Sequence, residues 1–406
     1  MKTAVLGLYA YAWDVLDEGP DAVLDGVERA GLNSLYLAVW YHSGMFFLPH
    51  NPARRVYFPV PGALYFKPGD WIRDHPLAPP VSSLSDSWPK FWEELAERAE
   101  RRGISLSAWM PVFHNSGIGT SYPDVAVENP WGDRIFHTIC PSNEQVADLA
   151  RSVAADIAGR GIFDRILLES VEYLPLRHDH HHEVIGVPLG AEAEFLASLC
   201  FCPACRERQM RDGIDFDGVR DWTRRQVDSA SSARPAVPFE WERLEGGADG
   251  QFGGDLRVRE SGVSEATENI AGAIRAAAPD ITIAALDFGP LYPLGPNGRK
   301  WQNGVDLDDL LPLVDEIHPT YYFTDQAVLA DRFETYNALI RGEAAQVPAI
   351  RAILPQVSSE DELGVQVRAV ASASSGYTFY NYSFMDLATL DWIRGSVENY
   401  PPESGD

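Results

Sequence analysis

The stretch Phe163-Asp-Arg-Ile-Leu-Leu-Glu-Ser-Val-Glu-Tyr-Leu-Pro175 decides how this chain folds. Its apolar run, Ile166-Leu-Leu168, is typical of a β-strand buried on both faces, as the strands of a parallel sheet are. Glu169 ends the run, and a carboxylate there is costly unless water, a partner or a ligand meets it. Catalytic residues of parallel barrels follow their strands in this way. Glu169 is therefore the first candidate for a reacting group.

Strand-like and helix-like segments alternate on both sides of this stretch, which is the pattern of a parallel sheet wrapped by helices. One helix start is marked by Ser142-Asn-Glu-Gln145, a capping box ahead of an apolar periodic segment. An α/β fold with eight strands is most economically a single (β/α)8 TIM barrel spanning 1–406. The predicted strands are 4–12, 34–40, 105–113, 165–169, 281–287, 316–322, 350–354 and 377–382.

Two regions interrupt the alternation, so we expect long loops after strands 2 and 4. Residues 43–86 hold many prolines and aromatic residues and predict a long, partly ordered loop insertion. Residues 229–256 are rich in Ser, Ala and Gly and predict a flexible insertion before strand 5. Loops of this length in a compact domain are either functional or disordered.

The composition excludes several classes of function. The 406 residues include 33 Lys and Arg against 59 Asp and Glu, a net charge of −26, which argues against a nucleic-acid partner. No apolar stretch approaches the roughly 20 residues of a membrane span, and no cleavable leader is visible, so a cytoplasmic protein is expected. The sequence does not indicate the oligomeric state.

The predicted strand ends carry aromatic and acidic residues with few cations. This set suits a small neutral carbohydrate, because aromatic rings pack on sugar C–H surfaces and carboxylates bind hydroxyls. A phosphate would need Arg, Lys or a glycine-rich loop, and no organic cofactor is expected. The histidines among these residues are equally consistent with ordinary hydrogen-bonded side chains. The substrate-binding candidates are Trp13, Asp14, Trp40, His42, Trp109, His114, Glu172, Tyr321, Asp325 and Asn381.

Glycoside cleavage needs two carboxyl groups, one ionised and one protonated. We expect Glu169 to be the nucleophile and Asp287, which ends the fifth strand, to be the acid and base, with Asp325 as the alternative. Asp287 also suits a turn cap, and Glu172 suits a salt bridge at the rim. Strand 7 offers Gln356 rather than a carboxylate. The pattern predicts a retaining glycoside hydrolase that acts on a small oligosaccharide or glycoside.

Three motifs follow one another between Thr138 and Glu207. They are Cys140-Pro-Ser-Asn143, the strand segment Asp164-Arg-Ile-Leu-Leu-Glu-Ser-Val-Glu-Tyr173, and Cys200-Phe-Cys-Pro-Ala-Cys205. In this order they resemble the motifs of the hypothetical glycoside-hydrolase-like barrel proteins. The resemblance covers about a sixth of the chain. It implies an amylase-like layout, with the nucleophile on strand 4 and the acid on strand 5.

The strand motif departs from the family pattern at three positions. The family's aspartate falls on Glu169, its glycine on Arg165 and its arginine on Glu172. A glutamate reaches one methylene farther than an aspartate, so either the sugar sits differently or the residue has another role.

The four cysteines, Cys140, Cys200, Cys202 and Cys205, give the number of thiolates in a tetrahedral structural zinc site. A set of reduced, partly buried thiols that pack a loop is the alternative. A zinc ion with four thiolates is coordinatively closed and would not take part in catalysis.

His178-Asp-His-His-His-Glu183 is dense in ligand atoms but lacks the i, i+4 spacing that aims two imidazoles at one ion. A solvated loop is the favoured interpretation. Two further hypotheses stay open: a metal-dependent hydrolase or isomerase that uses these histidines with Glu169, and a non-catalytic sugar-binding barrel, which the departures in the strand motif favour.

Overall fold

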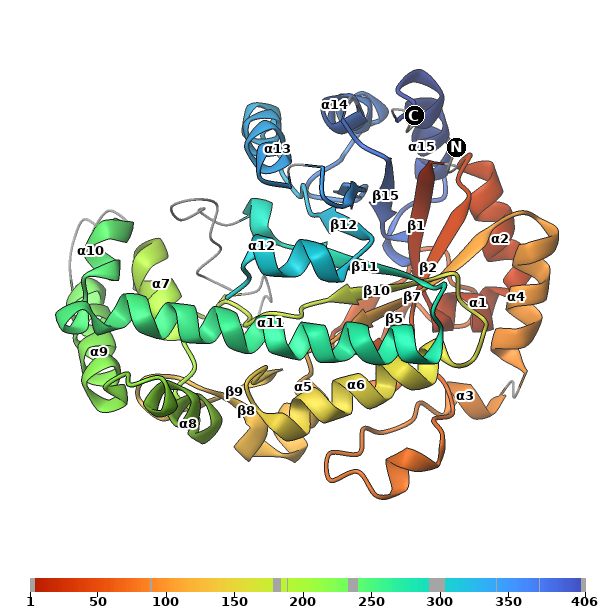
Figure 1. The fold of residues 1–406 in the computed structure, drawn as a ribbon. Helices are drawn as coiled ribbons and strands as arrows, with labels where there is room; N and C mark the ends of the chain where they lie inside the picture. Colours follow the sequence, from red (N-terminus) through yellow and green to blue (C-terminus); the bar gives the residue numbers. More distant parts are fainter. Residues whose placement is uncertain are drawn as a thin grey trace.

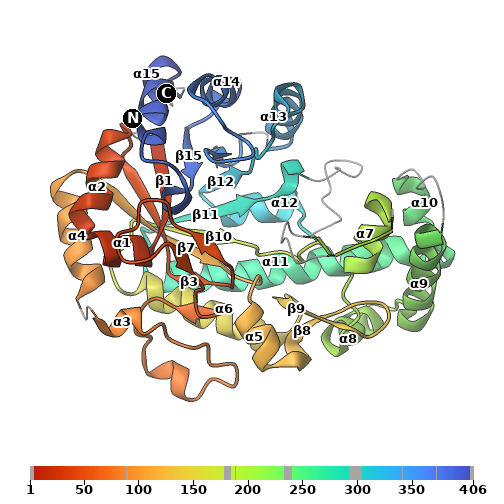
Figure 2. The same cartoon turned by 180° about the vertical axis from the view of Figure 1, so that it is seen from behind.

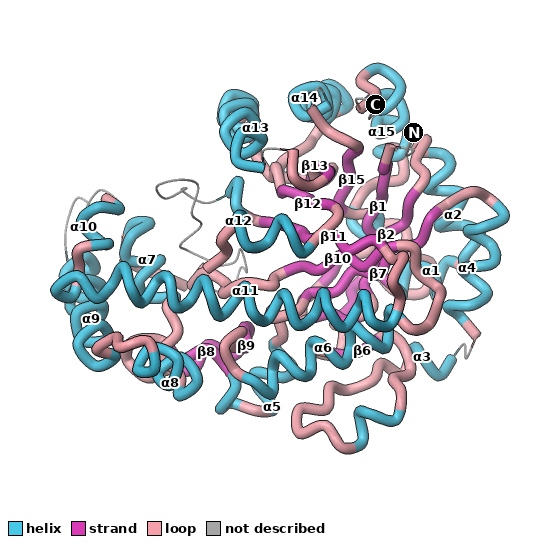
Figure 3. Tube along the Cα trace, viewed as in Figure 1, coloured by secondary structure: helices cyan, strands magenta, loops and turns pink. Residues whose placement is uncertain are grey.

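A parallel sheet forms the centre of the molecule, and helices surround it (Figures 1 and 3). The structure is a computed structural model. It describes residues 4–87, 90–177, 184–187, 189–232, 240–291, 304–340, 342–371 and 373–402.

Every strand of the central sheet runs parallel to its neighbours. The prediction of an α/β fold with a parallel sheet is confirmed. In order across the sheet the strands are β13 (Ala345–Gln346), β12 (Glu316–Pro319), β11 (Thr282–Asp287), β10 (Arg165–Glu169), β7 (Ser105–Pro111), β2 (Ser34–Ala38), β1 (Val5–Tyr11), β15 (Gly376–Tyr380) and β14 (Ala349–Arg351).

The sheet closes into a barrel because its two outermost strands, β13 and β14, belong to one short segment of chain. β13 pairs with β12, and β14 pairs with β15. The Val347 amide donates to the Ile317 carbonyl at 2.8 Å, and the Tyr321 amide donates to the Ala349 carbonyl at 2.9 Å. Pro348 has no amide hydrogen, which explains why the strand is interrupted there. In the described chain, the nine strand segments therefore act as the eight strands of a TIM barrel.

Helices connect the strands and cover the outside of the sheet (Figures 1 and 2). Helix α6 (Glu144–Ala158) begins at the predicted capping box, but its cap is Asn143. The Asn143 Oδ1 accepts the amides of Gln145 and Val146. Among the described residues, none of the helices has both the length and the apolar character needed to cross a membrane. The covering helices are α2 (Pro20–Arg29), α4 (Phe91–Arg101), α6 (Glu144–Ala158), α11 (Gln251–Ala277), α13 (Gln326–Ile340), α14 (Glu360–Ala371) and α15 (Thr389–Asn399).

The segment after strand 4 builds a helical extension at the end of α11 that lies away from the sheet (Figures 1 and 2). Part of the insertion expected to be flexible is helical there. Trp241, Leu244 and Phe252 are buried in an apolar cluster separate from the barrel core, and this burial favours the helices. The extension comprises α7 (Gly190–Ser198), α8 (Pro203–Arg211), α9 (Phe216–Ser232) and α10 (Trp241–Glu245).

The long loop after β2 is held together by short antiparallel pairs within it, and the Tyr65 amide donates to the Val39 carbonyl at 2.8 Å where the loop returns to the end of β2. The Trp40 indole also donates to the Gly62 carbonyl, at 2.9 Å. The elements of this loop are β3 (Trp40–Tyr41) with β6 (Ala63–Leu64), β4 (Phe46–Phe47) with β5 (Val56–Tyr57), and α3 (Leu84–Ser87). The remaining short elements are α1 (Ala12–Glu18), α5 (Ser116–Ser121), β8 (Ala126–Glu128), β9 (Arg134–Ile139) and α12 (Leu307–Leu310).

A buried ion pair identifies which side chains face the barrel interior. Arg165 on β10 donates to both carboxylate oxygens of Glu316 on β12, at 2.7 and 2.9 Å, across the intervening strand β11. Both side chains must therefore point inward. Side chains alternate along a strand, so Leu167 and Glu169 also face the interior.

The charge of Glu316 is compensated from two sides. Burial alone would raise the pKa of its carboxyl group, but the hydrogen bond with His318 and the charge of Arg165 outweigh burial and lower the pKa to about 2. The His318 Nε2 lies 3.2 Å from the carboxylate. The barrel floor thus holds an ionised carboxylate between two partners.

We expect Glu316→Gln to lower the free energy of unfolding by about 3–5 kcal/mol at pH 7, because Arg165 stays buried without its counter-charge. The folded pKa lies below the ordinary value of 4.5, so this stabilisation is present above pH 4.5 and is lost as the pH falls toward 2. Urea denaturation at pH 7 and at pH 3 measures the difference. Glu334→Gln, exposed on α13, is the matched control. An equal difference in unfolding free energy between wild type and Glu316→Gln at both pH values would contradict the lowered pKa of Glu316.

Candidate active site

Glu169 ends β10 at the carboxyl-terminal face of the barrel, where parallel barrels carry their active sites. Its side chain is 7% exposed. The Trp109 indole N–H donates a hydrogen bond to its Oε2. Burial raises the pKa of Glu169 to about 7, and the indole hydrogen bond offsets only part of that rise. A carboxyl group in this state holds its proton near neutral pH and can release it.

The strand register explains why this indole reaches the carboxylate. Glu169 is paired with Pro111 on β7, and Leu167 is paired with Trp109. Trp109 therefore faces the interior one layer below Glu169, with its N–H within reach of the carboxylate above it. Because the indole is an uncharged donor, it holds the carboxylate without supplying a counter-charge.

Several tyrosines lie close enough to the carboxylate to feel its charge. The Tyr11 hydroxyl donates to that of Tyr41 at 2.8 Å and lies 3.2 Å from that of Tyr380. Burial raises the pKa of both Tyr41 and Tyr380, and the charge of Glu169 adds to the rise. The same two causes act on Tyr322. These hydroxyls are therefore neutral at physiological pH and can donate and accept hydrogen bonds with sugar hydroxyls.

Asp287 ends β11 but belongs to the other face of its strand. Glu169 is in register with Leu286, so the alternation places Asp287 among the outward-facing positions. Its Oδ1 accepts the Gly289 amide at 2.9 Å, as a turn cap does. Tyr321 is close enough to feel its charge, and this ring packs against Phe333 of α13, on the helix side of the barrel. The structure does not bring Asp287 into the layer of Glu169.

The other predicted carboxylates lie at different places. Asp325 is exposed and accepts the amides of Ala327 and Val328 at the start of α13. Asp14 is fully buried, accepts the Tyr11 amide and the Ser383 hydroxyl, and has a pKa of about 7, chiefly because of burial. Both side chains therefore act as caps in this structure.

Glu172 is 2% exposed and follows Glu169 by three residues. It lies beyond Ser170, whose positive φ of 54° marks a sharp turn at the end of the strand. Of the carboxylates predicted for the site, it is the one closest to Glu169 along the chain.

The predicted tryptophan platform is covered by protein. Trp13, Trp40 and Trp109 are 0–1% exposed. Trp13 stacks on Tyr11, with the ring centroids 4.1 Å apart. Trp109 lies one layer below Glu169, and the aromatic side chains that keep partial exposure beside Glu169 are Tyr322 and Tyr380.

The histidines and Asn381 have defined surroundings. His42 stacks on His114 with ring centroids 3.7 Å apart, and on Tyr41, which joins this pair to the tyrosine group. The Asn381 Oδ1 accepts the Ser383 amide at 2.9 Å in the turn after β15. The segment 178–183 lies outside the described residues.

Sequence reasoning missed Tyr380 and Arg351 at the site. The seventh barrel strand ends with β14 at Arg351. The predicted strand ran to 354, and this later end placed Gln356 at the barrel face. Arg351 is paired with Tyr380 and shares its inward orientation. The alternation of side chains along 349–351 and 376–380 could have identified both residues as inward-facing. It could be used only once the ends of the two strands were known.

The four cysteines form a second cluster, located where the loop after β9 meets the loop before α8. Their sulfur atoms all lie within 4.8 Å of one another, and all four side chains are buried free thiols. Four thiolates bound to one zinc ion stand about 3.8 Å apart, so the spacing fits a tetrahedral site. Burial raises the pKa of the Cys140 and Cys200 thiols well above the ordinary value, whereas hydrogen bonds from the other three thiols hold the pKa of the Cys205 thiol well below it.

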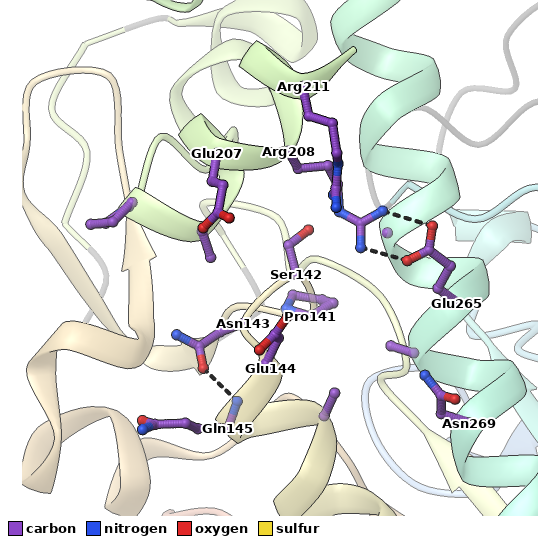
Figure 4. A pocket seen from close by; sticks show the side chains of 15 residues that line it. Pro141, Ser142, Asn143, Glu144, Gln145, Glu207, Arg208, Arg211, Glu265 and Asn269 are labelled. Atoms are coloured by element: carbon purple, nitrogen blue, oxygen red, sulfur yellow. Dashed lines mark hydrogen bonds and ion pairs between the residues drawn. The ribbon is translucent and has the colours of Figure 1, made fainter.

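A cavity of about 490 Å³ lies beside this cluster, between α6, α8 and α11, and is separate from Glu169 (Figure 4). Two arginines line it: Arg208 is paired with Glu265, at 2.7 and 2.8 Å, and Arg211 lies close enough to Glu265 to lower the pKa of that carboxyl group. Glu144 and Glu207 add negative charge to the wall. The wall therefore offers no evident reacting group.

No family model matches the chain, and no curated protein sequence does. Solved structures do resemble it. The glycoside hydrolase domain of PgaB (BpsB) from Bordetella bronchiseptica has a TM-score of 0.58 and 12% identity, with 94% of this chain and 95% of that chain covered. The catalytic domain of β-amylase from Paenibacillus polymyxa has a TM-score of 0.56 and 12% identity, covering 98% and 99%.

The GH42 β-galactosidase Gan42B from G. stearothermophilus has a TM-score of 0.58 and 12% identity, covering 98% of this chain and 57% of that chain. At this level of identity the likenesses establish the fold. The chain folds as glycoside hydrolase barrels do.

We expect Glu169→Gln to stabilise the protein at alkaline pH. The folded pKa of about 7 lies above the ordinary 4.5, so the wild type loses stability as the pH rises from about 4.5 through 7. The variant should gain up to ~3 kcal/mol of unfolding free energy at pH 8 and little at pH 4. Denaturant unfolding at the two pH values tests this, with Glu334→Gln as control. A variant less stable than wild type at pH 8 would show that the folded protein stabilises the ionised carboxylate of Glu169.

Proposed function

We propose that the protein is a glycoside hydrolase in which Glu169 donates the proton to the leaving oxygen. The observation that carries this proposal is the carboxyl group itself: it is buried at the carboxyl-terminal face of the barrel, held by an uncharged indole, with a pKa of about 7. A general acid works best when its pKa lies near the working pH.

This role differs from the one expected from the sequence, in which Glu169 is the nucleophile. A nucleophilic carboxylate must be ionised, whereas among the described residues Glu169 has the Trp109 indole as its hydrogen-bond donor and no paired cation that would keep it so. In the proposed reaction, the proton leaves Glu169 for the glycosidic oxygen as the bond to the anomeric carbon breaks. The Tyr322 and Tyr380 hydroxyls, whose side chains keep partial exposure, would bind the sugar hydroxyls.

The proposed reaction also needs a second carboxyl group. Asp287 is the choice made from the sequence, but its register and its hydrogen bond to the Gly289 amide favour a structural role. Glu172, buried just beyond the same strand, is the alternative that we favour. It would attack the anomeric carbon or activate a water molecule, according to its distance from Glu169 in the complex.

A non-catalytic sugar-binding barrel is the second candidate function. One observation favours it: among the last inward-facing residues of the described strands, Glu169 is the one carboxylate, while Tyr11, Pro111, Arg351 and Tyr380 occupy other ends. The metal-dependent alternative depends on the histidines of 178–183, which lie outside the described residues.

We also propose that the four cysteines hold one structural zinc ion. The supporting observations are the mutual distances of the sulfur atoms and the nearby Arg259, which donates to the Cys200 carbonyl at 2.6 Å and offsets thiolate charge. The ion would join the loop at Cys140 to the helical extension. Four protein ligands leave no position for a substrate.

We expect Glu169→Gln to lower kcat/KM for unactivated aryl glycosides by roughly 10²–10⁴-fold, because the leaving group no longer receives a proton. Dinitrophenyl glycosides, whose leaving group needs no proton, should lose much less. The wild-type rate should fall as the pH rises above about 7, and this decline should vanish in the variant.

Asp287→Asn and Glu172→Gln, assayed with the same substrates, identify the second carboxyl group. The residue that acts as nucleophile or base is required whatever the leaving group. Wild-type rates in Glu169→Gln would exclude the proposed mechanism. Sugar binding without any turnover in the wild type would favour the non-catalytic barrel.

For the metal, we expect the purified protein to carry one zinc ion per chain by elemental analysis, and Cys205→Ser to lose the zinc and to melt at a lower temperature. Ser142→Ala, which alters a hydroxyl beside the cluster but no thiol, is the control and should keep the zinc. A zinc-free protein whose Tm is unchanged by chelator and by Cys205→Ser would contradict the proposal.

A further inference from the structure

Arg351 is a cation at the face of the barrel that carries Glu169. It is the last residue of β14, it is paired with Tyr380 of β15, and it faces the interior by the register of the sheet. Its guanidinium carbon lies 6.0 Å from the ring centroids of both Tyr322 and Tyr380. All three side chains are partly exposed, so solvent or a ligand can reach them.

Arg351 is partly exposed, and it differs from the buried arginines Arg165 and Arg259 in having no carboxylate partner among the described residues. Arg165 is paired with Glu316, and Arg259 is paired with Asp255 at 2.9 Å. The Arg351 Nε is buried without a hydrogen-bond partner within the described chain. In a protein with 59 acidic residues against 33 basic ones, a guanidinium left unpaired at the barrel face is informative. A buried donor without a partner is costly unless something else satisfies it.

The strand order separates this cation from Glu169, because β11 and β12 lie between β10, which ends in Glu169, and the β13–β14 strand, which ends in Arg351. Tyr322 and Tyr380 each feel the charge of Glu169 and the charge of Arg351, and the two charges shift their pKa values in opposite directions. Arg351 forms no ion pair with Glu169 in the structure. A ligand lying on these hydroxyls would therefore have the acid at one end and the guanidinium at the other.

We propose that Arg351 binds the carboxylate of an acidic sugar, so that the substrate is a glycoside of a uronic acid rather than a neutral one. This inference rests on the proposed function and narrows its substrate class. The planar guanidinium matches a carboxylate with two parallel hydrogen bonds, and the aromatic rings beside it limit hydration of the pair. It revises the expectation of a neutral sugar, which was drawn from a set of strand ends that did not include Arg351.

Matched substrate pairs test the proposal. Aryl glucuronides against aryl glucosides, and aryl galacturonides against aryl galactosides, in both anomers, differ only in the C6 group. We expect the wild type to prefer the acidic member, and Arg351→Met to lower kcat/KM for it by roughly 10- to 100-fold more than for the neutral member. Arg351→Lys, which keeps the charge but not the planar fork, should retain part of the preference. Arg368→Met, exposed on α14, is the control and should leave the preference intact.

Binding separates this inference from the proposed function. Calorimetric titration with glucuronate, galacturonate, glucose and galactose requires no turnover. If no glycoside is cleaved but uronate binding is present in wild type and lost in Arg351→Met, the inference holds and the hydrolase proposal fails. Equal use of acidic and neutral members, or uronate binding unchanged in a folded Arg351→Met, would overturn the inference whether or not the protein is a hydrolase.

Discussion

Closure of the parallel barrel determines which side chains meet at its centre. Once β13 and β14 are two halves of one strand, each strand has two neighbours and its side chains must alternate between the interior and the helices. The contact between Arg165 and Glu316 across β11 shows which set is inside. Glu169 belongs to that set and Asp287 does not, although both end a hydrophobic strand.

Two glutamates in the same barrel illustrate how surroundings decide ionisation. Glu316, on the floor, has a cation and a histidine beside it, and its pKa falls to about 2. Glu169, at the opposite end, has an indole N–H and tyrosine hydroxyls, and its pKa rises to about 7. Both are buried, so burial alone does not distinguish them. The difference lies in the compensating charge, which favours an ionised carboxylate at one end and a protonated carboxyl group at the other.

Much of the fold could be read from the chain. The predicted strand 165–169 coincides with β10, and the helix expected after the capping box at Ser142 is α6. The predicted end of strand 7, however, fell beyond Arg351, because the apolar residues of 350–354 extend the pattern past the last paired residue. Helices in part of 229–256 were not predicted either. Their apolar residues are few and widely spaced, and they are buried only by helices distant in sequence.

By itself, the sequence determined the alternation of strands and helices, the hydrophobic strand that ends in Glu169 and the count of four thiols, because these depend on local periodicity and on residue chemistry. Only the tertiary structure decided that Trp109 holds Glu169, that Asp287 faces the helices, that four distant sulfur atoms converge and that Arg351 stands unpaired beside two tyrosines. The orientations of Trp109, Asp287 and Arg351 arise from register between strands far apart in the chain, and a shift of one residue would reverse each of them. The sulfur atoms converge because the chain brings the loop at Cys140 beside the start of α8.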